Sequence, residues 1–299
     1  MSRAAQIALT TAALSFIFYM LLGLMPGDPI DLAIMADPRL TAEDAARLRT
    51  LHGLDQPLLT RYLAWAGAVL RGEFGFSRLF ARPVAALLWP ALLSTLALLG
   101  WAILIAAGLG VALGVLAALR PRAAPAVQGV ALLAQAMPGF WLGIMLIVVF
   151  AVWLGWLPAG GAESWGALIL PVATLAFGQM AAYARHAAAA MEAALREPWV
   201  RSARARGASE GRVAWHHALP NAAVPLLTLL GLDAGGLVSG AVITETLFAR
   251  PGMGKLIFDA IMGNDYNLAL LALLVIALVT MLGGWGADLA QRALDPRLR

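Results

Sequence analysis

Residues 197–225 read E-P-W-V-R-S-A-R-A-R-G-A-S-E-G-R-V-A-W-H-H-A-L-P-N-A-A-V-P, a long polar stretch in an otherwise apolar chain. Pro198 suits the first position of a helix. Gly207 suits the position just past a helix end, because glycine adopts a left-handed backbone without strain. Ser209 can cap a second helix, which we expect to run until Pro220 ends it. The stretch therefore predicts a compact helix-turn-helix between two hydrophobic segments.

Arginines surround the turn of this predicted helix-turn-helix. The block is too polar for lipid, and its start and stop signals are too regular for a slack loop. We interpret it as a docking element. The alternative is an ordinary positively charged loop on the inner side of a membrane. The arginines are Arg201, Arg204, Arg206 and Arg212.

The composition indicates a polytopic membrane protein. Of 299 residues, 61% are hydrophobic and 13% are charged, and the mean hydropathy is +0.80. A membrane span needs about 20 apolar residues. The chain has no cysteine, which excludes disulfides and thiolate metal sites. We attribute the pI of 10.1 to arginine on cytoplasmic loops rather than to nucleic-acid binding.

Six apolar segments predict an all-α protein with six transmembrane helices. A cleaved signal peptide is the alternative for the first segment, but P-G-D-P at 26–29 is not a small-residue cleavage site. We expect the third segment to kink at Pro138-Gly139. The tryptophans at 153, 156 and 165 suit an interfacial belt. The segments are Ala4–Met25, Leu92–Leu119, Val127–Leu157, Leu168 to about Ala190, Ala222–Phe248 and Leu268 to about Leu289.

A long polar segment follows the first span and predicts a helical insertion outside the membrane. We expect one helix over 42–51 and a second that opens at Asp55 and Pro57 and closes at Gly72. Apolar residues recur every three or four positions on the second helix, at Leu58, Tyr62, Ala66 and Val69. The predicted division is a first transmembrane helix over 1–27, an external domain over 28–90 and a five-span core over 91–299.

The charge distribution predicts both termini in the cytoplasm. Arginines concentrate on the short loops that this orientation places inside, including those between 185 and 212. The only basic residues in the two short outer turns are Arg250 and Lys255. The positive-inside rule therefore puts the docking element, residues 192–221, in the cytoplasm.

Several motifs together resemble the peptide/nickel group of ABC importer permeases. The spacing from Ala203 through Gly207 to Leu219-Pro220 is similar to the cytoplasmic Glu-Ala-Ala loop of these permeases. R-A-R-G-A-S at 204–209 departs from the group pattern at Arg206. The other matching motifs are P-G-D-P at 26–29, L-H-G-L-D-Q-P at 51–57, R-G-E-F-G-F-S at 71–77, M-P-G-F-W-L-G at 137–143, E-T-L-F-A-R-P-G-M-G at 245–254, D-Y at 265–266 and D-P-R at 295–297.

The resemblance implies one permease subunit of a bacterial ABC importer in the inner membrane. It implies a second homologous permease, two cytoplasmic ATPases and a periplasmic or lipid-anchored binding protein as partners. It also implies that the docking element couples ATP hydrolysis in those partners to alternating access. The residues that we expect to carry this coupling are Arg201, Ala203, Arg204, Arg206, Gly207, Ser209, Glu210, Leu219 and Pro220.

No catalytic or cofactor site is visible in the chain. A phosphate-binding loop needs a lysine followed by Ser or Thr, whereas Leu256 follows Lys255. His216 and His217 point about 100° apart on a helix, which is poor for shared metal ligation. We therefore expect no cofactor or metal in this chain, with ATP and magnesium held by partner subunits.

A second group of residues is predicted to line the outer part of the translocation path. Most lie in the turns after the fifth span, where their alternative role is only to shape the turn. Asp233 is an isolated acid inside that span, and it can face the path, the partner permease or the inner water boundary. The group comprises Asp233, Glu245, Phe248, Pro251, Gly252, Gly254 and Asp265.

The sequence is compatible with more than one substrate and more than one energy source. Di- or oligopeptides are the first hypothesis, and nickel or a metal chelate is the second, because the turn W-L-P-A-G-G-A-E-S-W-G at 156–166 resembles nickel-type permeases. A gradient-driven secondary transporter would need coupling acids at the midplane, for which Asp233 alone is thin support. An intramembrane enzyme would need a nucleophile–base or metal constellation, which the motifs do not supply.

Overall fold

The computed structural model describes residues 2–23 and 56–294, which are almost entirely helical. One short antiparallel hairpin, β1 (Phe76–Ser77) with β2 (Arg82–Pro83), precedes the longest helix. The α-helices are α1 (Arg3–Gly23), α4 (Leu58–Leu70), α5 (Val84–Leu119), α6 (Ala124–Ala136), α7 (Gly139–Leu146), α8 (Gly166–Leu195), α9 (Pro198–Ala205), α10 (Glu210–Arg212), α11 (Leu219–Leu247), α12 (Met253–Met262) and α13 (Tyr266–Leu294), and two π-helical segments are η1 (Ile147–Trp153) and η2 (Val213–Ala218).

The prediction of a mostly helical membrane protein is confirmed. Four described helices are long and apolar enough to cross a membrane: α1, α5, α8 and the Tyr266–Gly286 part of α13. The pair formed by α6 and α7–η1 makes a fifth if it counts as one broken span. Helix α11 has 29 residues, more than the roughly 20 that a span needs. The count of six spans stays a prediction.

The third apolar segment bends far more than the predicted kink. Helix α6 ends at Ala136, α7 begins at Gly139, and the two parts meet at 99°. Pro138 lies between them with an extended backbone, φ −60° and ψ 133°. Proline cannot donate a backbone hydrogen bond and its ring opposes the preceding helical turn, so the chain restarts as a new helix. The segment is broken rather than kinked.

The fold divides into two compact units. The first comprises residues 1–91 and 256–278, and the second comprises 92–255 and 279–299. The predicted division at residues 27 and 90 is a functional one and stays a prediction. The predicted helix over 42–51 lies outside the described residues.

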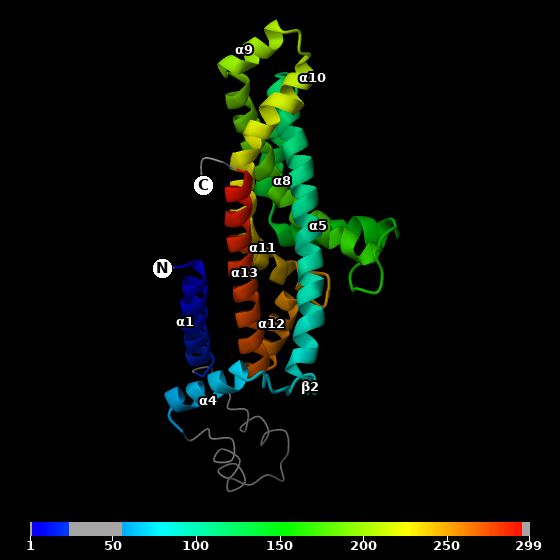
Figure 1. The fold of residues 1–299 in the computed structure, drawn as a ribbon. Coiled ribbons are helices and arrows are strands. Elements are labelled where there is room, and N and C mark those ends of the chain that lie inside the picture. The colour runs from blue at the N-terminus through cyan, green and yellow to red at the C-terminus, as the bar shows by residue number, and fades with distance from the viewer. Residues whose placement is uncertain (1, 24–55, 295–299) are drawn as a thin grey trace. The chain divides into compact units, whose positions relative to one another are not determined.

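In the first unit, α4 lies across the end of α1 (Figure 1). The predicted apolar face of α4 makes this contact. The Tyr62 ring lies 5.2 Å from that of Phe16, edge to face, and its hydroxyl lies 2.8 Å from Ser15 Oγ. Gly72, with φ +84°, follows the helix end as predicted. Period-3.6 patterning therefore identified the right face of α4.

In the second unit, α8 is the central helix, with α6, α7 and α11 packed against it. Helix α5 approaches α8 closely at two glycines one turn apart. A Cβ at Gly110 would lie 2.5 Å from Tyr183 Cβ, and one at Gly114 would lie 2.5 Å from Ala184 O. Small residues at this spacing allow two membrane helices to pack backbone to backbone.

Two helix positions differ from the sequence predictions. Helix α5 begins at Val84, eight residues before the predicted start of the second span, with Pro90 inside its first two turns. Pro90 is the seventh residue of the helix, so it removes one backbone hydrogen bond there and its ring opposes the carbonyl four residues earlier. Residues 253–262 form helix α12 rather than part of a simple outer turn. Its buried residues Met253, Leu256, Ile257 and Ala260 follow helical spacing, a signal that was present in the sequence.

Candidate functional site

The turn of the docking element has the backbone that its glycine predicts. Helix α9 ends at Ala205, and Gly207 follows with φ +84°. Gly207 N–H donates to Arg204 O at 2.9 Å and Ala208 N–H donates to Ala203 O at 3.1 Å. These two bonds form a Schellman motif, which satisfies the last carbonyls of a helix and needs the left-handed residue. The predicted stop at Gly207 is confirmed.

The second part of the element starts at its predicted cap. Ser209 Oγ accepts from Arg212 N–H at 3.4 Å, at the start of α10. An ion pair then ties α10 to α9. Arg204 Nε and Nη2 donate to the two carboxylate oxygens of Glu210, both at 2.9 Å. A bidentate pair of this kind fixes orientation as well as distance. It holds the two halves of the turn in one geometry.

Buried apolar side chains anchor the element to the membrane helices. Val200, Ala203 and Val213 form one cluster inside the element, with Trp199 packed against it. Ala214 and Ala218 belong to a second cluster, with Met191 of α8 and Val115 of α5. The element is therefore continuous with the cores of α5, α8 and α11, and Figure 1 shows α9 and α10 at the ends of α8 and α11. A displacement of the element would be transmitted to these helices.

The prediction that Pro220 ends the second helix is wrong. Helix α10 passes into the π-helical η2, and α11 starts at Leu219 without a break. The proline ring clashes with the carbonyl four residues earlier in a regular α-helix. The wider π turn changes this register, so the proline is accommodated as the helix continues. Asn221 Nδ2 also donates to His217 O at 2.8 Å.

Most of the predicted coupling residues lie on the solvent side of the element. Arg201, Arg204, Arg206, Gly207, Ser209, Glu210 and Pro220 are exposed, Leu219 is half-buried, and Ala203 is buried. Trp215 adds an exposed apolar side chain, 55% accessible, to the same element. The surface that results is basic with one large aromatic residue. Its role in coupling stays a prediction.

Glu245 is fully buried near the end of α11, where it caps the next helix. Its Oε2 accepts from Gly254 N–H at 2.7 Å and from Lys255 N–H at 3.2 Å, both in the first turn of α12. The first N–H groups of a helix have no partner within it and carry partial positive charge. Arg250, itself buried, lies near enough for a weak electrostatic attraction to the carboxylate.

Thr95 of α5 completes this arrangement. Its hydroxyl donates to Glu245 Oε1 and accepts from Met253 N–H at 2.8 Å. The glycines of P-G-M-G make the approach possible, since a Cβ at Gly252 would overlap the Glu245 carboxylate and one at Gly254 would lie 2.5 Å from Val242 Cα. Three segments of the chain therefore meet at one buried carboxylate.

The other predicted residues of this turn are also packed. Phe248 is 1% exposed, and its carbonyl accepts from Gly161 N–H at 2.9 Å. A Cβ at Gly160 would overlap the same carbonyl. Pro251 is exposed beside the buried Gly252. The structure brings Glu245, Gly252 and Gly254 together, and their predicted role at an outer gate stays a prediction.

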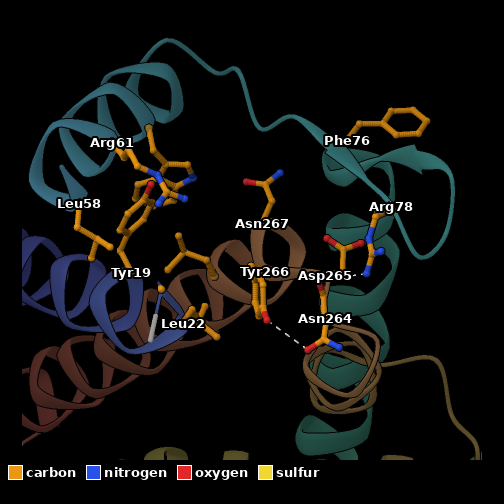
Figure 2. A pocket seen from close by; sticks show the side chains of 13 residues that line it. Tyr19, Leu22, Leu58, Arg61, Phe76, Arg78, Asn264, Asp265, Tyr266 and Asn267 are labelled. Carbon is orange, nitrogen blue, oxygen red and sulfur yellow. Dashed lines mark hydrogen bonds between the residues drawn. The ribbon is translucent and has the colours of Figure 1, made fainter. Parts of the chain in front are cut away.

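Asp265 caps α13 and holds the β1–β2 hairpin, as Figure 2 shows from the side of a cavity. Its Oδ2 accepts from Ser77 Oγ at 2.6 Å and from Leu79 N–H at 3.0 Å. Its Oδ1 accepts from Leu268 N–H at 3.3 Å, in the first turn of α13. Arg78 Nη2 reinforces the junction by donating to Gly263 O at 2.9 Å.

The cavity in Figure 2 has a volume of about 420 Å³. It lies between α1, α4, the hairpin and the turn before α13, all within the first unit. Both carboxylate oxygens of Asp265 already accept hydrogen bonds, so Asp265 supports the wall of the cavity. Its lining includes Tyr19, Arg61, Trp65, Phe76, Arg78 and Asp265.

The other candidate residues of the sequence analysis lie apart from the Glu245 and Asp265 sites. The backbone of Asp233 is part of helix α11. The His217 ring lies 6.4 Å from that of Trp199, which is a packing contact. Among the described residues, no group of three or more His, Asp or Glu side chains could hold a metal ion.

Two residues that sequence reasoning missed connect distant motifs. Ser77 ends the R-G-E-F-G-F-S motif and pairs with Asp265, which opens D-Y. Both motifs were visible, but nothing in either indicated the other as its partner. Thr95 had no local signal, because it lies in an apolar helix and its partner is 150 residues away.

Comparison with known proteins identifies the family. The sequence profile described as "binding-protein-dependent transport system inner membrane component" matches residues 110–299. This chain belongs to that family. The matched part of the permease includes the docking element, the Glu245 turn and Asp265.

Curated relatives extend the similarity to nearly the whole permease. It is 37% identical to a probable peptide ABC transporter permease of Sinorhizobium fredii, covering 96% of this chain and 95% of the relative. It is 32% identical to the oligopeptide permease AppB of Bacillus subtilis, over 95% and 94% of the two chains. It is 34% identical to the glutathione permease GsiC of Escherichia coli strain K12, over 97% and 95%. The predicted family is therefore confirmed.

A solved structure agrees with the fold. The chain from the inward-facing MetNI methionine ABC transporter superposes with a TM-score of 0.61 at 20% identity, covering 71% of this permease and 98% of that chain. The family and the curated relatives show that the permease is a multi-pass membrane subunit of an ABC transport system.

Proposed function

We propose that this permease is one of two homologous transmembrane subunits of an ATP-driven peptide importer. Its partners would be a second permease, two cytoplasmic ABC ATPases and an external binding protein. ATP and magnesium would be held by the ATPases, and this chain would carry no cofactor. Both termini would lie in the cytoplasm, with residues 28–90 on the outer side.

The observation that carries the coupling role is the construction of the docking element. It has a defined stop at Gly207, a cap at Ser209 and a bidentate bridge between Arg204 and Glu210. Buried side chains make it continuous with α5, α8 and α11. A rigid block with an exposed basic surface can receive a movement from a partner and pass it to these helices.

Peptides are the favoured substrate class because the three relatives described above are named for peptide, oligopeptide or glutathione transport. The nickel alternative has less support, since none of those names refers to a metal. Uptake of radiolabelled trialanine and of ⁶³Ni²⁺ by cells with and without the transporter distinguishes the two. Peptide import without nickel import is the expected result, and nickel import alone would overturn the peptide assignment.

Mild-detergent co-purification from native membranes tests the assembly. We expect a second permease and P-loop ATPases to elute with this chain. Gly207→Pro should release the ATPases, because proline removes the N–H that bonds to Arg204 O and cannot adopt a positive φ. A chain that purifies alone or only with itself would contradict the importer.

A matched pair of charge reversals tests the contact surface. Arg206→Glu changes an exposed arginine of the docking element, and Arg122→Glu changes an exposed arginine between α5 and α6. Only Arg206→Glu should reduce the amount of ATPase retained, and its difference from wild type should shrink at higher salt, because salt screens exposed charges. Equal losses would show that the effect reflects net charge and not the docking element.

A further inference from the structure

A groove of about 400 Å³ lies where the third apolar segment breaks. It is formed by the end of α6, the start of α7, the middle of α8 and the outer part of α11, all within the second unit. The volume is in the range of sites that bind small molecules. Its polar lining consists of Gln135, Gln179, Thr174 and Thr244, and glycines 139, 178 and 240 also line it.

The polar side chains of the groove retain hydrogen-bonding capacity. Thr244 is 3% exposed, and in the part of the chain that the structure describes its hydroxyl has no hydrogen-bond partner. The amides of Gln135 and Gln179 likewise have none among the described residues. An amide left without a partner in hydrocarbon costs several kcal/mol. Gln135 is exposed and Gln179 is half-buried, so a position against lipid would leave their amides unpaired at that cost.

The backbone at the break is a second reason to place this groove against water or protein and not against lipid. Pro138 is extended, and the first hydrogen bond of α7 runs from Leu142 N–H to Pro138 O at 3.1 Å. The N–H groups of Gly139 and Phe140, both in the lining, precede that bond and have no partner inside the helix. Irregular backbone at membrane depth is tolerated only where it is covered by protein or lines a water-filled cavity.

We propose that this groove is a subsite for the backbone of a peptide in transit, which deepens the proposed function and rests on it. Amides and hydroxyls offer donors and acceptors that match a peptide group. No charged side chain belongs to the lining, so contact would depend on the backbone and not on the charge of the peptide side chains. A site of this kind suits a translocation path for peptides of many different sequences.

Thiol accessibility tests the subsite, because the chain has no cysteine of its own. Gln179→Cys places one thiol in the groove, and Leu133→Cys places one on an exposed part of α6 outside the lining. The full complex with its binding protein is reconstituted in liposomes and treated with a charged, water-soluble methanethiosulfonate. Labelling of this chain is read by mass spectrometry. Trialanine with ATP is the probe for protection.

We expect Gln179→Cys to react at least about tenfold faster than Leu133→Cys, because a thiol in lipid stays protonated and unreactive. Trialanine should slow that reaction several-fold. Equal reaction rates, or a fast reaction that trialanine leaves unchanged, would overturn the subsite. Failure of the wild-type complex to import trialanine would instead overturn the proposed function, which separates the two.

A volume change provides a second test. A Cβ at Gly178 or at Gly129 of α6 would have no heavy atom within 4 Å, so both positions accept a larger side chain in this chain. Only Gly178 lines the groove. Gly178→Leu should reduce trialanine uptake several-fold and Gly129→Leu should not, with both complexes assembled. Wild-type uptake by an assembled Gly178→Leu complex would contradict the subsite.

Discussion

Ser77 donates a 2.6 Å hydrogen bond to Asp265 across 188 residues of sequence. Both side chains are buried, at 0% and 3% exposure. Asp265 also caps α13 and binds the backbone of Leu79, so one carboxylate joins the β1–β2 hairpin to the start of the last helix. The R-G-E-F-G-F-S and D-Y motifs thus form a single junction.

Ser77→Ala should destabilise the permease, because it removes the shortest hydrogen bond of a buried carboxylate. A bond to a charged group contributes about 1.5–3 kcal/mol. We expect the purified protein to lose its monodisperse gel-filtration peak at a temperature several degrees lower than wild type. Ser164→Ala, at an exposed serine, is the control. Equal behaviour of the two variants would show that the Ser77 bond contributes nothing.

Thr95→Val should loosen the start of α12, because it removes the bonds to Glu245 and from Met253. The single lysine of the chain, Lys255, lies at that point, so a lysine-specific protease reports local opening at one bond. Loss of about 1–3 kcal/mol corresponds to cleavage faster by roughly 5- to 150-fold when the segment closes again faster than it is cleaved, so that the rate follows the population of the open form. Thr95→Ser keeps the hydroxyl and should resist cleavage like wild type. Faster cleavage of both variants would show that the packing of the Thr95 side chain, and not its hydroxyl, stabilises the start of α12.

Gly207→Ala should weaken the docking element, because φ +84° costs an L-residue about 1–2 kcal/mol. Gly211→Ala is the matched control. Gly211 lies in α10 without a positive φ, and a Cβ there has no heavy atom within 4 Å. We expect less ATPase retained on the purified complex for Gly207→Ala and no loss for Gly211→Ala. A similar result for both would exclude the backbone at Gly207 as the cause.

The Arg204–Glu210 pair should make the docking element sensitive to acid. The hydrogen bond from Arg204 holds the pKa of the Glu210 carboxyl below its ordinary value. Because the folded-state pKa is below that of an unfolded glutamate, about 4.3, the pair stabilises the element above that pH. The stabilisation disappears as the pH falls through the folded-state pKa. The effect is small, since both side chains are exposed.

Hydrogen exchange of the Ala208 and Arg212 amides measures this dependence after correction for the intrinsic exchange rate. Glu210→Gln should exchange a few-fold faster than wild type at pH 7. The difference should shrink as the pH falls through the folded-state pKa of Glu210 and vanish below it, where the wild-type carboxyl is protonated as well. If the exchange rates of Glu210→Gln and wild type still differ in acid, the cause is the shape of the side chain and not its charge.

Sequence reasoning predicted the features that depend on local chemistry. Membrane helices follow from apolar runs, the stop at Gly207 from its freedom to adopt a positive φ, and the cap at Ser209 from its hydroxyl. The apolar face of α4 followed from spacing alone. Helix α12 carried the same signal, and the turn residues before it obscured that signal.

The sequence by itself thus determined the family, from motifs in the same order along the whole chain. It also determined apolar spans and the turn of the docking element, because each of these depends on residues within a few positions of one another. Only the tertiary structure decided that Thr95 meets Glu245 and that Ser77 meets Asp265, since these partners are 150 and 188 residues apart. It also decided that the chain breaks by 99° near Pro138 and continues through Pro220. At Pro220 the π-helical turn η2 accommodates the proline ring, whereas at Pro138 the backbone is extended and the chain restarts as a new helix.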